Sequence, residues 1–106
     1  MIHIFLDDER QAPLGVVRTN TVKDTIELLC CCNVLSLSLD HDLDFDDNGK
    51  EMSGYDVICW IENMMHTSDY QPPKKIFCHS QNPVGRKRIQ VVIDRIEQYM
   101  ANHNES

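Results

Sequence analysis

Short apolar runs alternate with segments of helical periodicity along this chain, and this alternation is the feature that most constrains its fold. A short, nearly continuous apolar run is typical of a strand buried on both faces of a parallel sheet. The strands we expect are Met1–Leu6, Val16–Arg18, Val34–Leu39 and Ile76–Cys78. A chain with four such runs is expected to build its core around one sheet.

Three further segments carry apolar residues at helical spacing. Thr21 is an N-cap candidate for the first of these helices, and the second helix is expected to begin near Gly54. Asn82 followed by proline is a start signal for the third helix. Strands that alternate with helices form a parallel sheet through right-handed crossovers. We therefore predict a single three-layer α/β domain over residues 1–101, with a frayed tail at 102–106.

Unusual polar motifs directly follow three of the predicted strands. They are Asp7-Asp8-Glu9-Arg10 after the first strand, Asp40-His41-Asp42 after the third and His79-Ser80-Gln81-Asn82 after the fourth. Ligands of parallel α/β sheets bind beyond the carboxyl ends of the strands. The three motifs are therefore expected to meet in one site.

Acidic residues are concentrated near this expected site. The chain has 106 residues and a formal net charge of −7, from 17 acidic and 10 basic residues, and nine of the 17 acids lie within residues 7–9 and 40–51. This balance argues against a broad nucleic-acid surface, which needs basic charge. Carboxylates that converge repel one another unless a cation lies between them. Asp7, Asp8 and Asp40 therefore predict a site for Mg²⁺ or another divalent cation; helix capping or simple solvation is the alternative.

Two histidines stand at predicted strand ends, His41 and His79. Imidazole exchanges protons near neutral pH, so one of them could deprotonate water while the other protonates a leaving oxygen. A purely structural role is the alternative. His3, His66 and His103 are expected to be structural.

Basic residues lie near the start of the last predicted helix. Arg86, Lys87 and Arg88 are placed against the helix dipole, which favours acids at that position. An anion at this helix start would gain from the free N–H groups and from the basic side chains. Arg86 is therefore a candidate phosphate ligand, and solvation of all three side chains is the alternative.

Other chemistry is less well supported. The segment Asp44–Gly49 matches the first half of a calcium loop, but Tyr55 stands where the bidentate glutamate belongs. The five cysteines form no C-x-x-C pair, which argues against a zinc or redox site. The chain has no apolar run long enough for a membrane span and no signal-peptide pattern. A cytoplasmic protein without a membrane partner is expected.

Taken together, several motifs resemble those of the receiver-domain superfamily, and more closely the cyclic-phosphate processing receiver family. The resemblance covers Met1 to about Met100. Its pieces are Leu6-Asp7-Asp8-Glu9-Arg10 with Pro13, Ser38-Leu39-Asp40-His41-Asp42-Leu43, Gly54-Tyr55-Asp56 and His79-Ser80-Gln81-Asn82-Pro83-Val84-Gly85. The resemblance implies a flavodoxin-like fold whose four-stranded parallel sheet has the order 2-1-3-4.

The resemblance also implies roles for individual residues. Asp7, Asp8 and Asp40 would hold Mg²⁺ together with the backbone carbonyl of Asp42, and His41 and His79 would act with Asp40 as catalytic groups. Arg10, Ser80, Asn82 and Arg86 are the candidate substrate ligands, of which Ser80 and Asn82 would orient phosphate oxygens. The implied activity is metal-dependent processing of a cyclic phosphate on a nucleotide or an RNA end.

Two departures from ordinary receivers weaken a role in phosphoryl signalling. The first two predicted strands leave no room for a full helix between them, and the 106 residues contain neither a fifth strand nor its lysine. Lys74 and Lys75 begin a strand and cannot replace that lysine. The leading hypothesis is therefore a cyclic phosphodiesterase. A stand-alone receiver phosphorylated on Asp40 and a non-catalytic nucleotide-binding module are the alternatives, and the sequence makes no prediction of oligomeric state.

Overall fold

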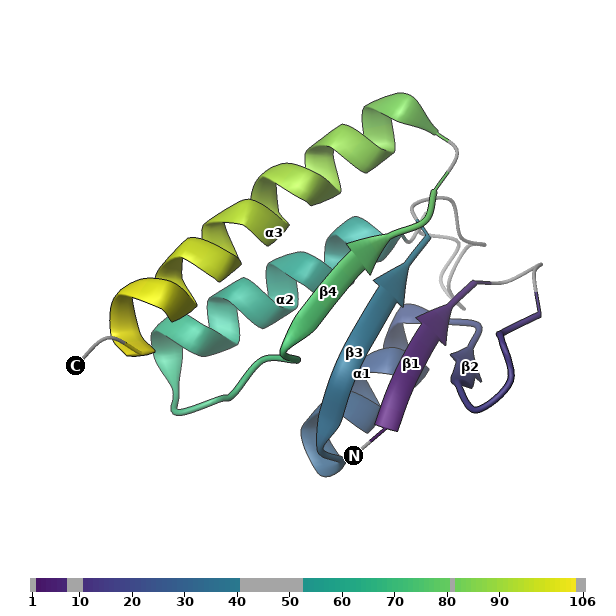
Figure 1. The fold of residues 1–106 in the computed structure, drawn as a ribbon, viewed down its shortest axis with the longest axis horizontal. Coiled ribbons are helices and arrows are strands. Elements are labelled where there is room, and N and C mark those ends of the chain that lie inside the picture. The colour runs from purple at the N-terminus through teal and green to yellow at the C-terminus, as the bar shows by residue number, and fades with distance from the viewer. Residues whose placement is uncertain (1, 8–10, 41–52, 81, 105–106) are drawn as a thin grey trace.

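The computed structural model describes residues 2–7, 11–40, 53–80 and 82–104. Within them the chain forms four strands and three helices (Figure 1). The strands are β1 (Ile2–Leu6), β2 (Val17–Thr19), β3 (Val34–Leu39) and β4 (Lys75–Cys78). The helices are α1 (Val22–Cys31), α2 (Gly54–Thr67) and α3 (Pro83–Asn104).

The sheet confirms the predicted topology. All strand pairs are parallel and the order is β2-β1-β3-β4. Leu6 pairs with Thr19 on one side and with Leu39 on the other, and Leu39 pairs with Cys78. The four carboxyl ends therefore lie along one edge of the sheet. The second strand begins and ends one residue later than the predicted Val16–Arg18.

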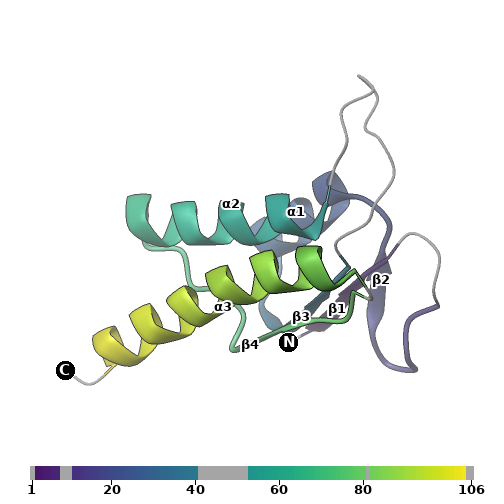
Figure 2. The ribbon, with the colours of Figure 1, turned by 90° about the horizontal axis from the view of Figure 1, so that it is seen from above.

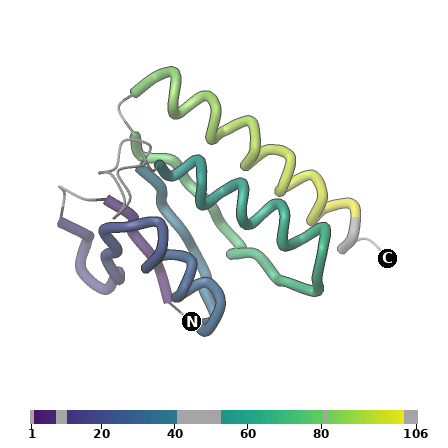
Figure 3. The backbone as a smooth tube through the Cα atoms, turned by 180° about the vertical axis from the view of Figure 1, so that it is seen from behind, coloured from purple at the N-terminus to yellow at the C-terminus, as the bar shows by residue number. Residues whose placement is uncertain are grey.

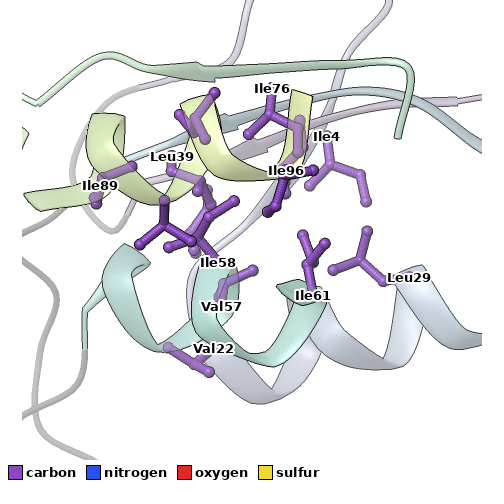
Figure 4. Close-up of a cluster of buried hydrophobic side chains, with 14 of the residues drawn as sticks. Ile4, Val22, Leu29, Leu39, Val57, Ile58, Ile61, Ile76, Ile89 and Ile96 are labelled. Carbon is purple, nitrogen blue, oxygen red and sulfur yellow. The ribbon is translucent and has the colours of Figure 1, made fainter. Parts of the chain in front are cut away.

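The helices cover only one face of the sheet, which corrects the prediction of three layers (Figures 2 and 3). Every second strand residue points toward the helices, as Ile4, Leu37 and Ile76 do. These side chains form a single hydrophobic core with residues of all three helices (Figure 4). The reason is the short connection from β1 to β2, which has no helix among its described residues. Right-handed crossovers place α1 and α2 on one face, because both carry the chain across the sheet in the same direction.

Local signals begin each helix. The Thr21 hydroxyl accepts a hydrogen bond from the Asp24 N–H, and Ser53 forms a capping box with Asp56 at the start of α2. The Asn82 Oδ1 accepts hydrogen bonds from two N–H groups at the start of α3, both at 3.1 Å, as an N-cap should.

Helix α3 extends beyond its predicted end. Its backbone continues through Asn104, into the segment 102–106 that we expected to fray, because no glycine or proline interrupts it there. No helix in the described part of the chain combines the length and apolar character that a membrane crossing requires. The calcium-loop candidate, Asp44–Gly49, lies outside the described residues.

Candidate functional site

Three of the predicted site residues occupy the first position after neighbouring strands. The N–H of Asp7 donates to the carbonyl of Thr19 (3.0 Å), that of Asp40 to Leu6 (3.0 Å) and that of His79 to Leu39 (2.9 Å). These hydrogen bonds extend the parallel ladders one residue beyond the strands. The backbones of Asp7, Asp40 and His79 are thereby held side by side at the carboxyl edge.

Their side chains converge. One ligand atom from each of Asp7, Asp40 and His79 lies within 4.8 Å of the other two. Asp7 is buried, with 1% of its surface exposed, and its Oδ2 is 3.0 Å from the Nε2 of His79. Two carboxylates this close repel each other, and burial strengthens the repulsion. Carboxylate oxygens and an imidazole nitrogen are donors that a divalent cation accepts, so this donor set fits such an ion.

The imidazole of His79 is held on three sides. Its Nδ1 is 2.7 Å from the Ser38 hydroxyl, its Nε2 contacts Asp7, and its ring stacks on Phe5 with centroids 4.2 Å apart and planes 10° apart. A hydroxyl can donate to a bare Nδ1 or accept from a protonated one. Ser38 therefore orients the ring and leaves Nε2 directed at the carboxylates.

Sequence reasoning gave Ser38 no such role. The available signal was the alternation of leucine and serine in β3, where Leu37 and Leu39 are buried in the core. Ser36 and Ser38 must then point to the opposite face. Only the pairing of β3 with β4 shows that His79 emerges on that same face.

Gly54 lets helix α2 approach the site. A Cβ on this residue would collide with the carbonyl oxygen of Asp40 and would lie 3.2 Å from the Cβ of Leu39. The first turn of α2 therefore packs directly on the Asp40 backbone, and any side chain there would separate the two. This close approach is the physical requirement behind the Gly54 of the sequence motif.

The topology and this cluster agree with the comparison to known families. A family model for the cyclic-phosphate processing receiver domain matches residues 2–95. The chain belongs to this family. Comparisons with curated proteins and with solved structures give no significant match.

In this receiver domain, two predicted phosphate ligands help to form the start of α3. Ser80 is buried, and its hydroxyl accepts a hydrogen bond from the Asn82 N–H (3.1 Å). Asn82 uses Oδ1 to cap the helix. Both residues thus shape the loop that follows His79, and their contact with phosphate stays a prediction.

The basic residues of α3 divide into different roles. Burial raises the pKa of the Cys78 thiol, and the negative charge of Asp40 raises it further. A hydrogen bond from the Ser80 N–H and the positive charge of Arg86 lower the same pKa. The Arg86 N–H donates to the carbonyl of Asn82 (2.8 Å), so Arg86 lies in the first turn of α3. Arg88 instead stacks over the Tyr55 ring, with its guanidinium carbon 4.3 Å from the centroid.

The remaining predicted site residues are Asp8, Arg10, His41 and Asp42, and they lie outside the described residues. The structure thus brings together Asp7, Asp40 and His79, adds Ser38 to them and places Arg86 in the first turn of α3. Their catalytic, substrate-binding and metal-binding roles stay predictions.

Proposed function

We propose that this receiver-like domain opens cyclic phosphodiesters by metal-dependent hydrolysis. The observation that carries the proposal is the convergence of Asp7, Asp40 and His79 at the carboxyl edge of the sheet. It joins the two groups this reaction needs, a site for a cation and a group that exchanges protons. The family's name, which refers to cyclic-phosphate processing, supports the same reaction class.

Asp7 and Asp40 would hold the cation, for which Mg²⁺ is our choice because its ligands are oxygens. Asp8 and the carbonyl of Asp42 would complete its ligand set, as the resemblance implies. When bound, the ion would neutralise charge on the non-bridging oxygens of the phosphate. The ion would also balance the charge of the two converging carboxylates.

His79 would move a proton at Nε2, and His41 would serve as its partner. In the reaction a water oxygen adds to phosphorus while the bond to one ribose oxygen breaks. One histidine takes a proton from the water and the other gives a proton to the departing ribose oxygen. Ser38 would keep the His79 ring in position throughout.

The phosphate would lie between this cluster and the start of α3. Arg86 would pair with a phosphate oxygen, and the N–H groups of the first helical turn favour an anion in the same place. Ser80 and Asn82 would orient the phosphate from the loop between β4 and α3, and Arg10 would complete its ligands.

The test is hydrolysis of a nucleoside 2′,3′-cyclic monophosphate with added Mg²⁺, with products separated and weighed. Asp40→Asn and His79→Ala are each expected to lower turnover at least about 100-fold. The matched controls are Asp69→Asn and His66→Ala, two exposed residues outside the cluster, which should retain full activity. Undiminished turnover in Asp40→Asn and His79→Ala would contradict the proposal, as would full activity in a metal chelator.

The same preparation distinguishes two other functions. Incubation with a small phosphodonor followed by intact-mass measurement would reveal a phosphoryl group on Asp40 if the domain were a signalling receiver. Lys74 and Lys75 lie at the amino-terminal end of β4, away from Asp40, so we expect no stable adduct. Tight binding of the cyclic nucleotide without product would instead indicate a nucleotide-binding module.

A further inference from the structure

The sheet face opposite the helices carries an ordered set of side chains. No helix of the described chain covers this face, which is turned to the viewer in Figure 1. We call it the open face, and define it by Phe5, Arg18, Ser36, Ser38, Lys75 and Phe77. Strand pairing aligns Arg18 with Phe5, Phe5 with Ser38 and Ser38 with Phe77, so these four form one row across the sheet.

The candidate catalytic cluster lies at the carboxyl edge of the sheet, on the same side as the open face. Asp7, Asp40 and His79 each lie two residues beyond a member of that row, directly after the strand that carries it. Successive residues of a strand alternate between faces, so positions two apart share one. The stacking of His79 on Phe5 places the cluster on this side. A molecule bound along the open face can therefore reach the cluster with one of its ends.

The charge of the open face differs from that of the whole chain. The chain has a formal net charge of −7, yet none of the residues in the four strands is acidic. Arg18 and Lys75 are both exposed on the open face, and the Nε of Arg18 donates to the carbonyl oxygen of Asp7 (3.0 Å). The open face thus carries positive charge on its strands, whereas the acidic cluster lies at the carboxyl edge.

An exposed aromatic ring completes the pattern. Phe77 of β4 is 52% exposed and stands two residues before His79, which directly follows that strand and is about 6.6 Å further along the chain. Aromatic rings on a sheet surface with nearby basic side chains are the features on which single-stranded nucleic acids stack their bases and place their phosphates. Bases paired within a duplex do not present their faces in this way.

We propose that the open face binds the last nucleotides of a single-stranded RNA, whose terminal cyclic phosphate enters the Asp7–Asp40–His79 cluster. This inference rests on the proposed function and specifies its substrate class. A base stacks on Phe77, and Lys75 and Arg18 contact phosphates of the preceding nucleotides. A second copy of the chain fits less well, because it would bring two positively charged faces together.

Binding of a short single-stranded RNA ending in a 2′,3′-cyclic phosphate tests the role of Phe77. Phe77→Ala is expected to weaken binding about tenfold, and Phe77→Trp to restore it, because stacking on an aromatic side chain provides this binding energy. The control is Val91→Ala, an apolar residue of α3 that is 49% exposed, and it should bind like the parent protein. Equal affinities of Phe77→Ala and the parent would overturn the proposal.

The salt dependence of binding tests the charges. Replacing Lys75 by Gln should reduce the slope of log affinity against log salt by about 0.7, the contribution of one phosphate contact in a single strand. Lys87→Gln, which removes the same charge from an exposed position of α3, should leave the slope unchanged. Equal slopes for the two variants would contradict the assignment.

Activity on a cyclic mononucleotide separates this inference from the proposed function. If the inference is right, Lys75→Gln opens the mononucleotide at the parent rate, because the mononucleotide lacks the preceding phosphate that Lys75 contacts, but it opens the RNA end more slowly at low substrate concentration. A parent protein that opens neither substrate refutes the proposed function, whereas RNA binding that depends on Phe77 would still support the binding face. RNA binding no tighter than mononucleotide binding, or a dimer that Phe77→Ala dissociates, would refute the binding face.

Discussion

The two faces of the same sheet carry opposite chemistry. The face toward the helices presents Leu6, Leu37 and Leu39, which are completely buried, whereas the open face presents serine, phenylalanine, arginine and lysine. One face therefore provides the free energy of folding, and the other is available for chemistry and binding. Because no described helix covers the second face, the candidate site at the carboxyl edge adjoins the open face.

The largest expected difference between the faces is in stability. Leu37→Ala should lower the free energy of unfolding by about 2–5 kcal/mol, because it removes buried apolar volume and leaves a cavity. Phe77→Ala should lower it by less than about 1 kcal/mol, because Phe77 is half exposed. Urea unfolding of both variants measures the contrast. Similar losses in the two variants would show that Phe77 is buried in solution and that the open face is covered.

The second prediction concerns the place where the helix layer meets the site. Gly54→Ala should destabilise the domain by about 1–3 kcal/mol, because its Cβ would press on the Asp40 carbonyl and push α2 away. Turnover of the cyclic nucleotide should also fall, because Asp40 would shift with its backbone. Asn63→Ala, at an exposed position of α2, is the control for the change in helix propensity. Full stability and activity in Gly54→Ala would be incompatible with the close approach.

A third, smaller effect is expected within the open face itself. Ser38→Ala should reduce turnover by up to about tenfold, because it removes a hydrogen bond worth about 0.5–1.5 kcal/mol to the His79 ring. It should also change the NMR nitrogen shifts of that ring, and Ser38→Thr should restore both. Ser36→Ala is the matched control, because the Ser36 hydroxyl contacts the Nδ1 of His3 instead (2.6 Å). Identical behaviour of the Ser36 and Ser38 variants would remove the positioning role from Ser38.

The smallest effect concerns the helix side of the sheet. Burial, with a smaller effect from Cys30, raises the pKa of Tyr70 to about 12. Because the pKa is raised in the folded state, its contribution to stability is complete below pH 10 and is lost as the pH rises toward 12. The effect is small because the hydroxyl is only about half buried. Thermal unfolding between about pH 9 and 11 should therefore show a shallower decline in Tyr70→Phe than in the parent.

Much of the fold followed from local patterns. The strand Val34–Leu39 was predicted at its observed bounds, and the start of α3 at Asn82 and Pro83 was predicted as well. Both rest on interactions between residues close in the sequence, namely alternation along a strand and capping of a helix. The layer count was wrong because the direction of each crossover, and so the face that each helix covers, depends on the whole sheet.

The candidate site divides in the same way. Asp7, Asp40 and His79 could be predicted because each directly follows an apolar strand, and parallel strands end at one edge. Ser38 could not be assigned a role, because its contact with His79 joins residues 41 positions apart. The open face could not be predicted either, because Arg18, Phe5 and Phe77 form one row only when the strands pair.

The strands, the helix starts and the residue types at the carboxyl edge could be predicted from the chain alone, because they depend on its periodicity and on short-range hydrogen bonds. The single helix layer, the contacts of Ser38 and Phe5 with His79, and the basic, aromatic surface beside the cluster became visible only in the folded domain. Strand pairing and crossover handedness bring together side chains that no local pattern connects.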